Sequence, residues 1–297
     1  MVPRQILPGS TYLVSRRCTQ RQFLLAPKPQ TTAIFGYCLA VAAARYNIQV
    51  HAACVMSNHW HAVVTDPDAR IPAFLAYLHK YVAKAVNALL KRRENLWSTA
   101  QPSFVRLFAP EDVLAKIVYV VTNPVAASLV PRAELWPGLL RYLPRHSKTF
   151  ARPETFFRKD GPMPAEAALK LTVAPALADL GADELERRVQ NLVRSEENRF
   201  ERERRASKRT CLGLERLRNQ RPTDQPGSPE PRHQLIPKLA AREKERRLEA
   251  LQLLRNFVAA YRKAWTRWHE GVRGVLFPAG TYALKVLAGV RCRKAET

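Results

Sequence analysis

The chain has 297 residues, 46% of them hydrophobic, and its 49 lysines and arginines against 25 aspartates and glutamates give a formal net charge of +24. This length allows one large domain or two smaller ones, and so large a basic excess predicts a polyanionic partner, most often nucleic acid. The five cysteines are scattered without a C-x-x-C pair, which argues against a disulfide scaffold or a cysteine zinc site and predicts a reducing cytoplasm. Within the cytoplasm, we expect the protein to be associated with the nucleoid. No membrane association is expected, because the apolar run at residues 33–44 is too short to cross a bilayer.

Strand and helix patterns alternate through the first half of the chain. We expect a strand with a basic face over 10–25, a helix over 33–46, a hairpin over 50–65, a helix over 71–90, a strand over 104–108 and a helix from 113 to about 122. The last helix should end before Pro124, because proline disfavours helical geometry in the residue before it. This order predicts an α+β fold, a small antiparallel sheet with helices on one face.

Prolines interrupt the pattern after residue 142, so we place a domain boundary near 150. Residues 151–297 should form a mainly helical, basic C-terminal extension with a flexible linker at about 220–235. The charged stretch 183–209 and the long amphipathic stretch 236–268 are its expected helices. Either could contact DNA, pack within the chain or join two copies in a homodimer.

The hairpin carries a histidine pair just after its expected turn at Ser57 and Asn58. Side chains alternate faces along a strand, so His59 and His61 share one face while Trp60 points to the core. Two imidazoles on one rigid face can bind one divalent cation. The alternative is a half-exposed strand that merely carries two polar residues.

The third helix carries Tyr119 and Asn123, four residues apart and therefore on one face. From spacing alone, Tyr119 could be a half-buried aromatic, and Asn123 before Pro124 could be a helix stop. Tyr77, Tyr81 and Tyr142 are the competing tyrosines, but none of them stands four residues before an Asn or Gln.

The strings VMSNHWHAVV and IVYVVTNPVAASLV, in this order within a basic α+β domain, resemble the IS200-like transposases of the HUH superfamily. These are single-tyrosine DNA strand-transfer enzymes, and the REP-associated tyrosine transposases are the most similar group. The resemblance covers roughly residues 7–140 and gives residues 1–150 the expected HUH core. Trp60 is bulkier than the usual aliphatic residue of the pair, and Ser57 stands where many relatives have proline.

The resemblance implies a role for each site residue. His59, His61 and Asn123 would hold Mg²⁺ or Mn²⁺, and Tyr119 would attack the scissile phosphate and leave a 5′-phosphotyrosine link with a free 3′-OH. The implied substrate is single-stranded DNA near a hairpin.

Basic residues near these motifs are the expected phosphate contacts. They are Arg16, Arg17, Arg21, Lys91, Arg92, Arg93, Arg141 and Arg145. Two other functions remain open from the sequence: a non-catalytic hairpin DNA-binding protein or repressor derived from the same fold, and a non-catalytic RNA- or DNA-binding module with a ferredoxin-like sheet.

Overall fold

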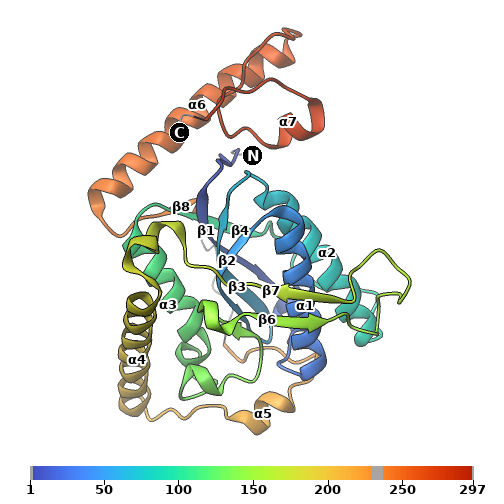
Figure 1. Cartoon of the computed structure of the whole chain (residues 1–297), viewed down its shortest axis with the longest axis vertical. Helices are drawn as coiled ribbons and strands as arrows, with labels where there is room; N and C mark the ends of the chain where they lie inside the picture. Colours follow the sequence, from blue (N-terminus) through green and yellow to red (C-terminus); the bar gives the residue numbers. More distant parts are fainter. Residues whose placement is uncertain (1–2, 229–236, 296–297) are drawn as a thin grey trace.

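A six-stranded, mostly antiparallel sheet forms the centre of the computed structural model, which describes residues 3–228 and 237–295 (Figure 1). Its strand order is β5-β2-β3-β1-β4-β8, and a separate two-stranded ribbon pairs β6 with β7. The strands are β1 Ser10–Arg17, β2 Gln49–Val55, β3 His59–Asp66, β4 Ser103–Leu107, β5 Leu140–Arg141, β6 Lys148–Ala151, β7 Glu166–Leu169 and β8 Leu239–Ala240. The predicted α+β fold with a central antiparallel sheet is confirmed.

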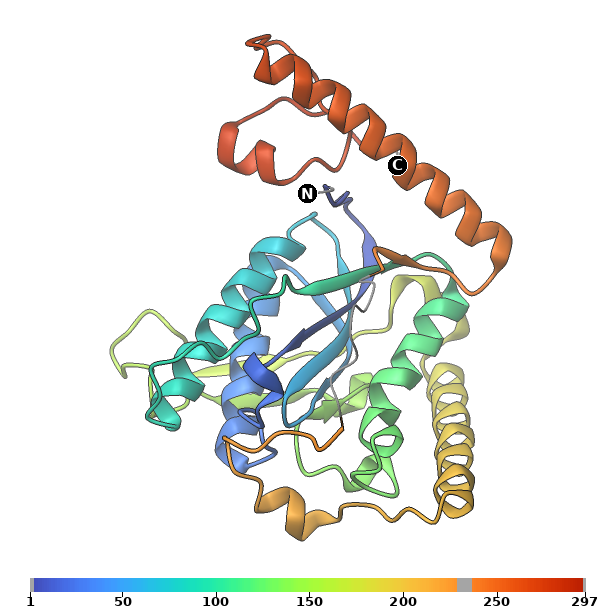
Figure 2. The same cartoon turned by 180° about the vertical axis from the view of Figure 1, so that it is seen from behind.

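Helices cover both faces of this sheet, whereas the sequence suggested one face. α1 and α2 pack on the face that buries Trp60 and Tyr12, and α3 packs on the other face, with Ala52, Cys54 and Val63 (Figure 2). α4 lies outside α3 as a further layer (Figure 1). The helices are α1 Pro29–Tyr46, α2 Ile71–Leu89, α3 Pro110–Ala126, α4 Ala182–Ala206, α5 Leu214–Arg218, α6 Lys244–His269 and α7 Ala283–Ala288.

The predicted hairpin is confirmed as β2 and β3, with its turn at Ser57 and Asn58. Trp60 is fully buried against Phe35 (ring centroids 5.4 Å apart), as its alternation predicted. Cross-strand partners share a face, so the pairing of His61 with Ser15 places the two histidines on the α3 side of the sheet.

Three expected boundaries were wrong. α3 continues through Pro124 to Ala126, because a proline in the last turn removes only one helical hydrogen bond and here packs into the core. β1 ends at Arg17 and does not continue to residue 25, because a short 3₁₀ turn follows it. The long C-terminal helix begins at Lys244, because Leu239 and Ala240 pair with β4 in parallel. Its expected first residue, 236, lies outside the described residues.

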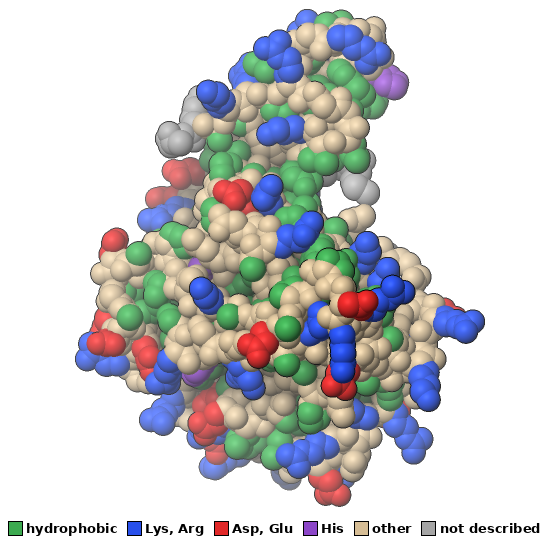
Figure 3. Space-filling model, turned by 45° about the vertical axis from the view of Figure 1, so that its right-hand side comes forward, with side chains coloured by type: hydrophobic (Ala, Val, Ile, Leu, Met, Phe, Trp, Pro, Cys, Tyr) green, Lys and Arg blue, Asp and Glu red, His purple; other side chains and the backbone are tan. Residues whose placement is uncertain are grey.

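The chain crosses residue 150 within β6, and the β6–β7 ribbon lies against α1 (Figure 1). Gly36 makes this contact possible, because a Cβ there would lie 2.3 Å from the Phe150 ring. Beyond the ribbon, α6 and α7 project from the body with a small core of their own around Phe277. Figure 3 shows Lys and Arg side chains spread over both the body and this projecting part.

The expected flexible linker is partly packed on the body. The Ser57 hydroxyl donates to Oε1 of Gln220 (2.5 Å), and the N–H of Phe23 donates to the carbonyl of Asp224 (2.9 Å). Its remainder, residues 229–235, lies outside the described part. None of the helices in the described ranges has the length and apolar character needed to cross a membrane.

The buried His51 should make the fold sensitive to acid. It hydrogen-bonds Thr65 and the carbonyl of Thr172, and burial lowers its pKa to about 4. The unfolded chain, with a histidine pKa of about 6.5, then binds the proton more readily than the folded chain. We expect the free energy of unfolding to fall by up to about 3 kcal/mol on this account as the pH drops from about 6.5 to 4.

Denaturant unfolding across this pH range measures the effect. His51→Gln should be less stable at pH 7 yet show a flatter pH dependence than wild type. The same substitution at the exposed His269 should leave the slope unchanged. Parallel slopes for His51→Gln and wild type would contradict the prediction.

Candidate functional site

The two histidines of β3 and the tyrosine of α3 meet on one face of the sheet. The ring centroids of His59 and His61 lie 4.8 Å apart, and those of His61 and Tyr119 lie 5.4 Å apart. Both histidines are half-buried, and Tyr119 is 41% exposed. The strand period of two and the packing of α3 across β2 and β3 produce this convergence, which lies within a single chain.

Asn58 in the turn orients the first histidine. Its Oδ1 lies 2.6 Å from Nδ1 of His59, and its amide nitrogen donates to the backbone carbonyl of Arg21 (3.1 Å). Because the amide nitrogen is engaged elsewhere, Oδ1 acts as acceptor and His59 carries its proton on Nδ1. The Nε2 lone pair of His59 is then left for an electrophile or cation.

Asn123 connects the two halves of the site. It lies one turn after Tyr119 on α3, close enough to His59 and Tyr119 to raise the pKa of His59 and to lower that of Tyr119. Its amide therefore sits between the imidazole pair and the phenol.

Burial keeps the imidazoles neutral. Burial lowers the pKa of His59 to about 4, although the neighbouring Asn123 opposes the shift. Burial also lowers the pKa of His61 well below its usual range, and the charges of His59 and Lys116 add to this effect. Burial raises the pKa of Tyr119, and the neighbouring Asn123 lowers it. Tyr119 is thus a neutral phenol at pH 7 that needs a base or a positive charge nearby to become a nucleophile.

A divalent cation suits this donor set. Neutral imidazole is the metal-binding form, and Nδ1 of His61 is buried without a hydrogen-bond partner among the described residues. The Asn58 contact is the kind of outer hydrogen bond that fixes a ligating histidine. The described residues contain no cluster of three His, Cys, Asp or Glu side chains arranged for a metal. The amide oxygen of Asn123 is the kind of donor that Mg²⁺ and Mn²⁺ accept.

A groove of about 930 Å³ opens beside Tyr119, between α3 and α4. Tyr119 and Lys116 line it from α3, with the Lys116 ammonium 5.4 Å from the Tyr119 ring centroid. Arg188 and Phe200 line it from α4. Arg199, Arg242 and Arg247 also belong to its walls, together with the acidic Glu111, Asp112 and Glu196, so the groove combines an excess of cations with aromatic faces.

Of the expected phosphate contacts, Arg17 and Arg21 lie closest to the histidines. Arg17 is exposed opposite His59 in the strand register, and the positive charges of Arg17 and Arg21 both help to lower the pKa of His59. Arg21 also donates to the carbonyl and hydroxyl of Ser228 (2.6 and 2.9 Å). Both are well placed to meet a phosphate at the histidines.

The other expected cations are held elsewhere. Arg16 lies on the opposite face, over Trp97, and Arg145 forms an ion pair with Glu186 of α4. Arg141 is half-buried in β5, where it donates to the carbonyl of Leu140. The structure does not bring these three to the histidine pair. Lys91, Arg92 and Arg93 follow α2, with Arg92 near the buried Cys18.

The competing aromatic residues lie in packed positions. Tyr77 and Tyr81 pack against one another with tilted rings in the α1–α2 layer (ring centroids 4.5 Å apart), and Tyr142 packs against His146. His79 is buried and accepts a hydrogen bond from the indole of Trp60 (3.2 Å), which makes it a helix-packing residue.

Several residues of the site escaped the sequence reasoning. Lys116 stands three residues before Tyr119 on the same helix, a spacing that could have revealed it. Arg188, Phe200, Arg242 and Arg247 had no such signal, because only the tertiary packing of α4 and of the segment after β8 brings them to the groove.

Comparison with known proteins finds several similar solved structures, including the following two. One is the structure of the REP-associated tyrosine transposase bound to a REP hairpin: it is 17% identical, with 46% of this chain and 78% of that chain covered and a TM-score of 0.39. The other is the "putative transposase" from Deinococcus radiodurans R1: it is 19% identical, with 38% of this chain and 88% of that chain covered and a TM-score of 0.29. No family model and no curated protein matches the chain.

Proposed function

We propose that this protein is a metal-dependent, single-tyrosine DNA strand transferase that cleaves and rejoins single-stranded DNA near hairpin sequences. The observation that carries the proposal is the convergence of His59, His61, Tyr119 and Asn123 on one face of the sheet. A pure binding protein has no need of a neutral imidazole pair beside an accessible phenol. Its place of action would be the cytoplasm, on chromosomal DNA.

Each residue has a distinct part in the reaction. Tyr119 attacks the scissile phosphorus and loses its phenol proton, the 3′-oxygen leaves and takes up a proton to become a 3′-OH, and the DNA 5′-phosphate becomes linked to the phenol oxygen. Asn123, close to the phenol, would help to position it. Lys116 favours the phenolate by its nearby charge, and Arg17 and Arg21 offset the charge of the phosphate.

Mg²⁺ or Mn²⁺ bound by His59, His61 and Asn123 would act as a Lewis acid on the phosphate oxygens. The rejoining step reverses the attack: a free 3′-OH takes the phosphate, and Tyr119 recovers its proton. Since the bond energy is kept in the covalent link, no external energy source is needed. All four residues come from one chain, so the proposed site does not require a homodimer.

The groove beside Tyr119 provides a path for the single strand. Its cations can follow a phosphate backbone, and Phe200, with the Arg199 guanidinium 4.2 Å from its ring centroid, can stack with a base. α4 would thereby form the second wall of the DNA path, on the side away from the sheet.

We expect Arg188→Gln to weaken single-strand binding several-fold and to reduce the slope of log affinity against log salt by about 0.7, the value for one lost phosphate contact on a single strand. Fluorescence anisotropy with an unstructured labelled oligonucleotide at several salt concentrations measures both. Arg194→Gln is the matched control, an exposed arginine of α4 outside the groove. Equal slopes for the two variants would exclude the groove as the path.

The function itself is tested with a labelled single-stranded hairpin library incubated with Mn²⁺ or Mg²⁺. A covalent protein–DNA band on a denaturing gel, dependent on metal, is the expected result. Hairpin binding without such a band under either metal would replace the enzyme with the alternative, a hairpin-binding repressor.

A further inference from the structure

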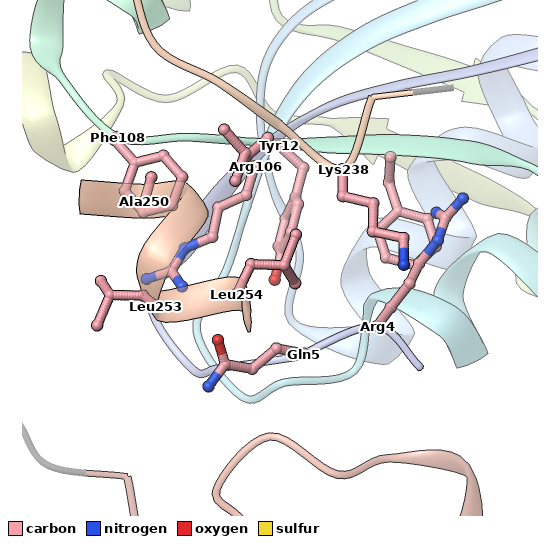
Figure 4. Close-up of a pocket in the computed structure, with 11 residues that line it drawn as sticks. Arg4, Gln5, Tyr12, Arg106, Phe108, Lys238, Ala250, Leu253 and Leu254 are labelled. Carbon is pink, nitrogen blue, oxygen red and sulfur yellow. The ribbon is translucent and has the colours of Figure 1, made fainter. Parts of the chain in front are cut away.

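Two contacts of the C-terminal region with the body lie on different sides of the sheet. On the face that buries Tyr12, β8 and α6 border a small pocket with Arg106 and the N-terminal segment (Figure 4). Elsewhere, residues 212–228 run across the body as a strap that includes α5 and passes the turn between β2 and β3 (Figure 2). The strap adjoins the candidate site, whereas the pocket lies on the face opposite to the histidines.

The strap begins at the end of the tyrosine helix. The N–H of Leu212 donates to the carbonyl of Ser128 (2.9 Å), just after α3. Leu217 is fully buried in the apolar cluster that also contains the inner face of α3. The strap is therefore anchored beside the helix that carries Tyr119 before it reaches the histidine turn.

Gln220 ties the strap to the histidine turn itself. Its Oε1 accepts a hydrogen bond from the Ser57 hydroxyl (2.5 Å), and both side chains are buried. Ser57 directly precedes Asn58, whose Oδ1 lies 2.6 Å from Nδ1 of His59. The strap thus holds the residue next to the one that fixes the His59 ring.

The strap also holds the loop behind this turn. The carbonyl of Asp224 accepts the N–H of Phe23 (2.9 Å), and the Arg21 guanidinium donates to the carbonyl and hydroxyl of Ser228 (2.6 and 2.9 Å). The amide nitrogen of Asn58 donates in turn to the backbone carbonyl of Arg21 (3.1 Å). Arg21 has a φ of 57°, which is unfavourable for a residue with a Cβ and persists where neighbouring contacts hold it. Asn58 is thus held by a carbonyl that the strap keeps in place.

We propose that the strap is a positioning element of the metal site and that Gln220 is its central residue. Through Ser57, Gln220 keeps Asn58 in the orientation that holds the Nδ1 proton of His59. Nε2 of His59 is then directed to the cation. The proposal rests on the proposed function for the role of the cation, whereas the effect on His59 itself requires neither metal nor DNA.

Gln220→Ala leaves the buried Ser57 hydroxyl without its acceptor. In the metal-free full-length protein, we expect the Nδ1 proton of His59 to exchange with water faster than in wild type, as measured by isotope-edited NMR. We also expect Mn²⁺ binding to weaken by about three- to tenfold, a smaller loss than the roughly tenfold to hundredfold typical of a direct partner of a ligating histidine. The electron paramagnetic resonance signal of free Mn²⁺ measures this affinity without DNA.

Two control variants separate positioning from stability. Gln225→Ala changes an exposed residue of the same strap and should match wild type in proton exchange and in Mn²⁺ affinity. His51→Gln lowers stability at the other end of the hairpin, where His51 bonds Thr65, and should leave the His59 proton and the Mn²⁺ affinity unchanged.

Ser57→Ala removes the same hydrogen bond from its other end and should reproduce both effects, so it replaces Gln220→Ala should that variant unfold. Adding Gln220→Ala to Ser57→Ala should then change little. If both single variants match Gln225→Ala in proton exchange and Mn²⁺ affinity, the proposal is overturned. A wild type that forms no covalent link with DNA would overturn the proposed function instead, and faster proton exchange in Gln220→Ala would still support the strap.

Discussion

Tyr119→Phe should lower formation of the covalent protein–DNA link by at least about a thousandfold, because it removes the one oxygen that would attack the phosphorus. The ring remains, so its contact with His61 and the packing of α3 are kept. Hairpin affinity should change little. A denaturing gel with labelled hairpin DNA and Mn²⁺ measures the link, and anisotropy measures the affinity.

The other tyrosines provide matched controls. Tyr77→Phe, Tyr81→Phe and Tyr142→Phe each remove one hydroxyl from a packed aromatic residue without touching the histidine pair. All three should keep the covalent band. Persistence of the band in Tyr119→Phe, with loss in one of the others, would transfer the nucleophile to that residue.

The local part of the site could be predicted from the sequence because it depends on short periods. The two-residue repeat of a strand fixes the common face of His59 and His61, and the four-residue spacing of a helix fixes that of Tyr119 and Asn123. Trp60 was placed in the core by the same rule. These shared faces depend only on the local strand or helix and not on the packing of the rest of the chain.

The surroundings of the site depend on long-range packing and could not be predicted in this way. The apolar stripe of α4 (Leu185, Val189 and Val193) shows which face packs on the body, but it does not reveal that Arg188 and Phe200 border a groove with α3. The pairing of Leu239 with Arg106 is a parallel contact between segments more than 130 residues apart, and two strand residues give no periodic signal. Pro124 shows the same limit: packing of the last turn of α3 overrides the local preference.

His59→Ala should lower Mn²⁺ affinity by at least about tenfold, since it removes one of two imidazole donors. Binding is measured without DNA, by the electron paramagnetic resonance signal of free Mn²⁺. The covalent link should fall in parallel at limiting Mn²⁺, and chelation of the metal should abolish it in wild type. Burial lowers the pKa of His59 to about 4, so the wild-type site should stay competent for metal well below pH 6.5.

Two further variants separate ligation from folding. Asn58→Ala leaves both imidazoles but removes the acceptor that fixes Nδ1 of His59, so its Mn²⁺ affinity should lie between those of wild type and His59→Ala. His269→Ala, on the exposed side of α6, should match wild type. Unchanged Mn²⁺ affinity in His59→Ala would mean that the imidazole pair is not the metal site. The cation would then have to be sought among oxygen donors beside Tyr119, such as Asp112 and Glu196.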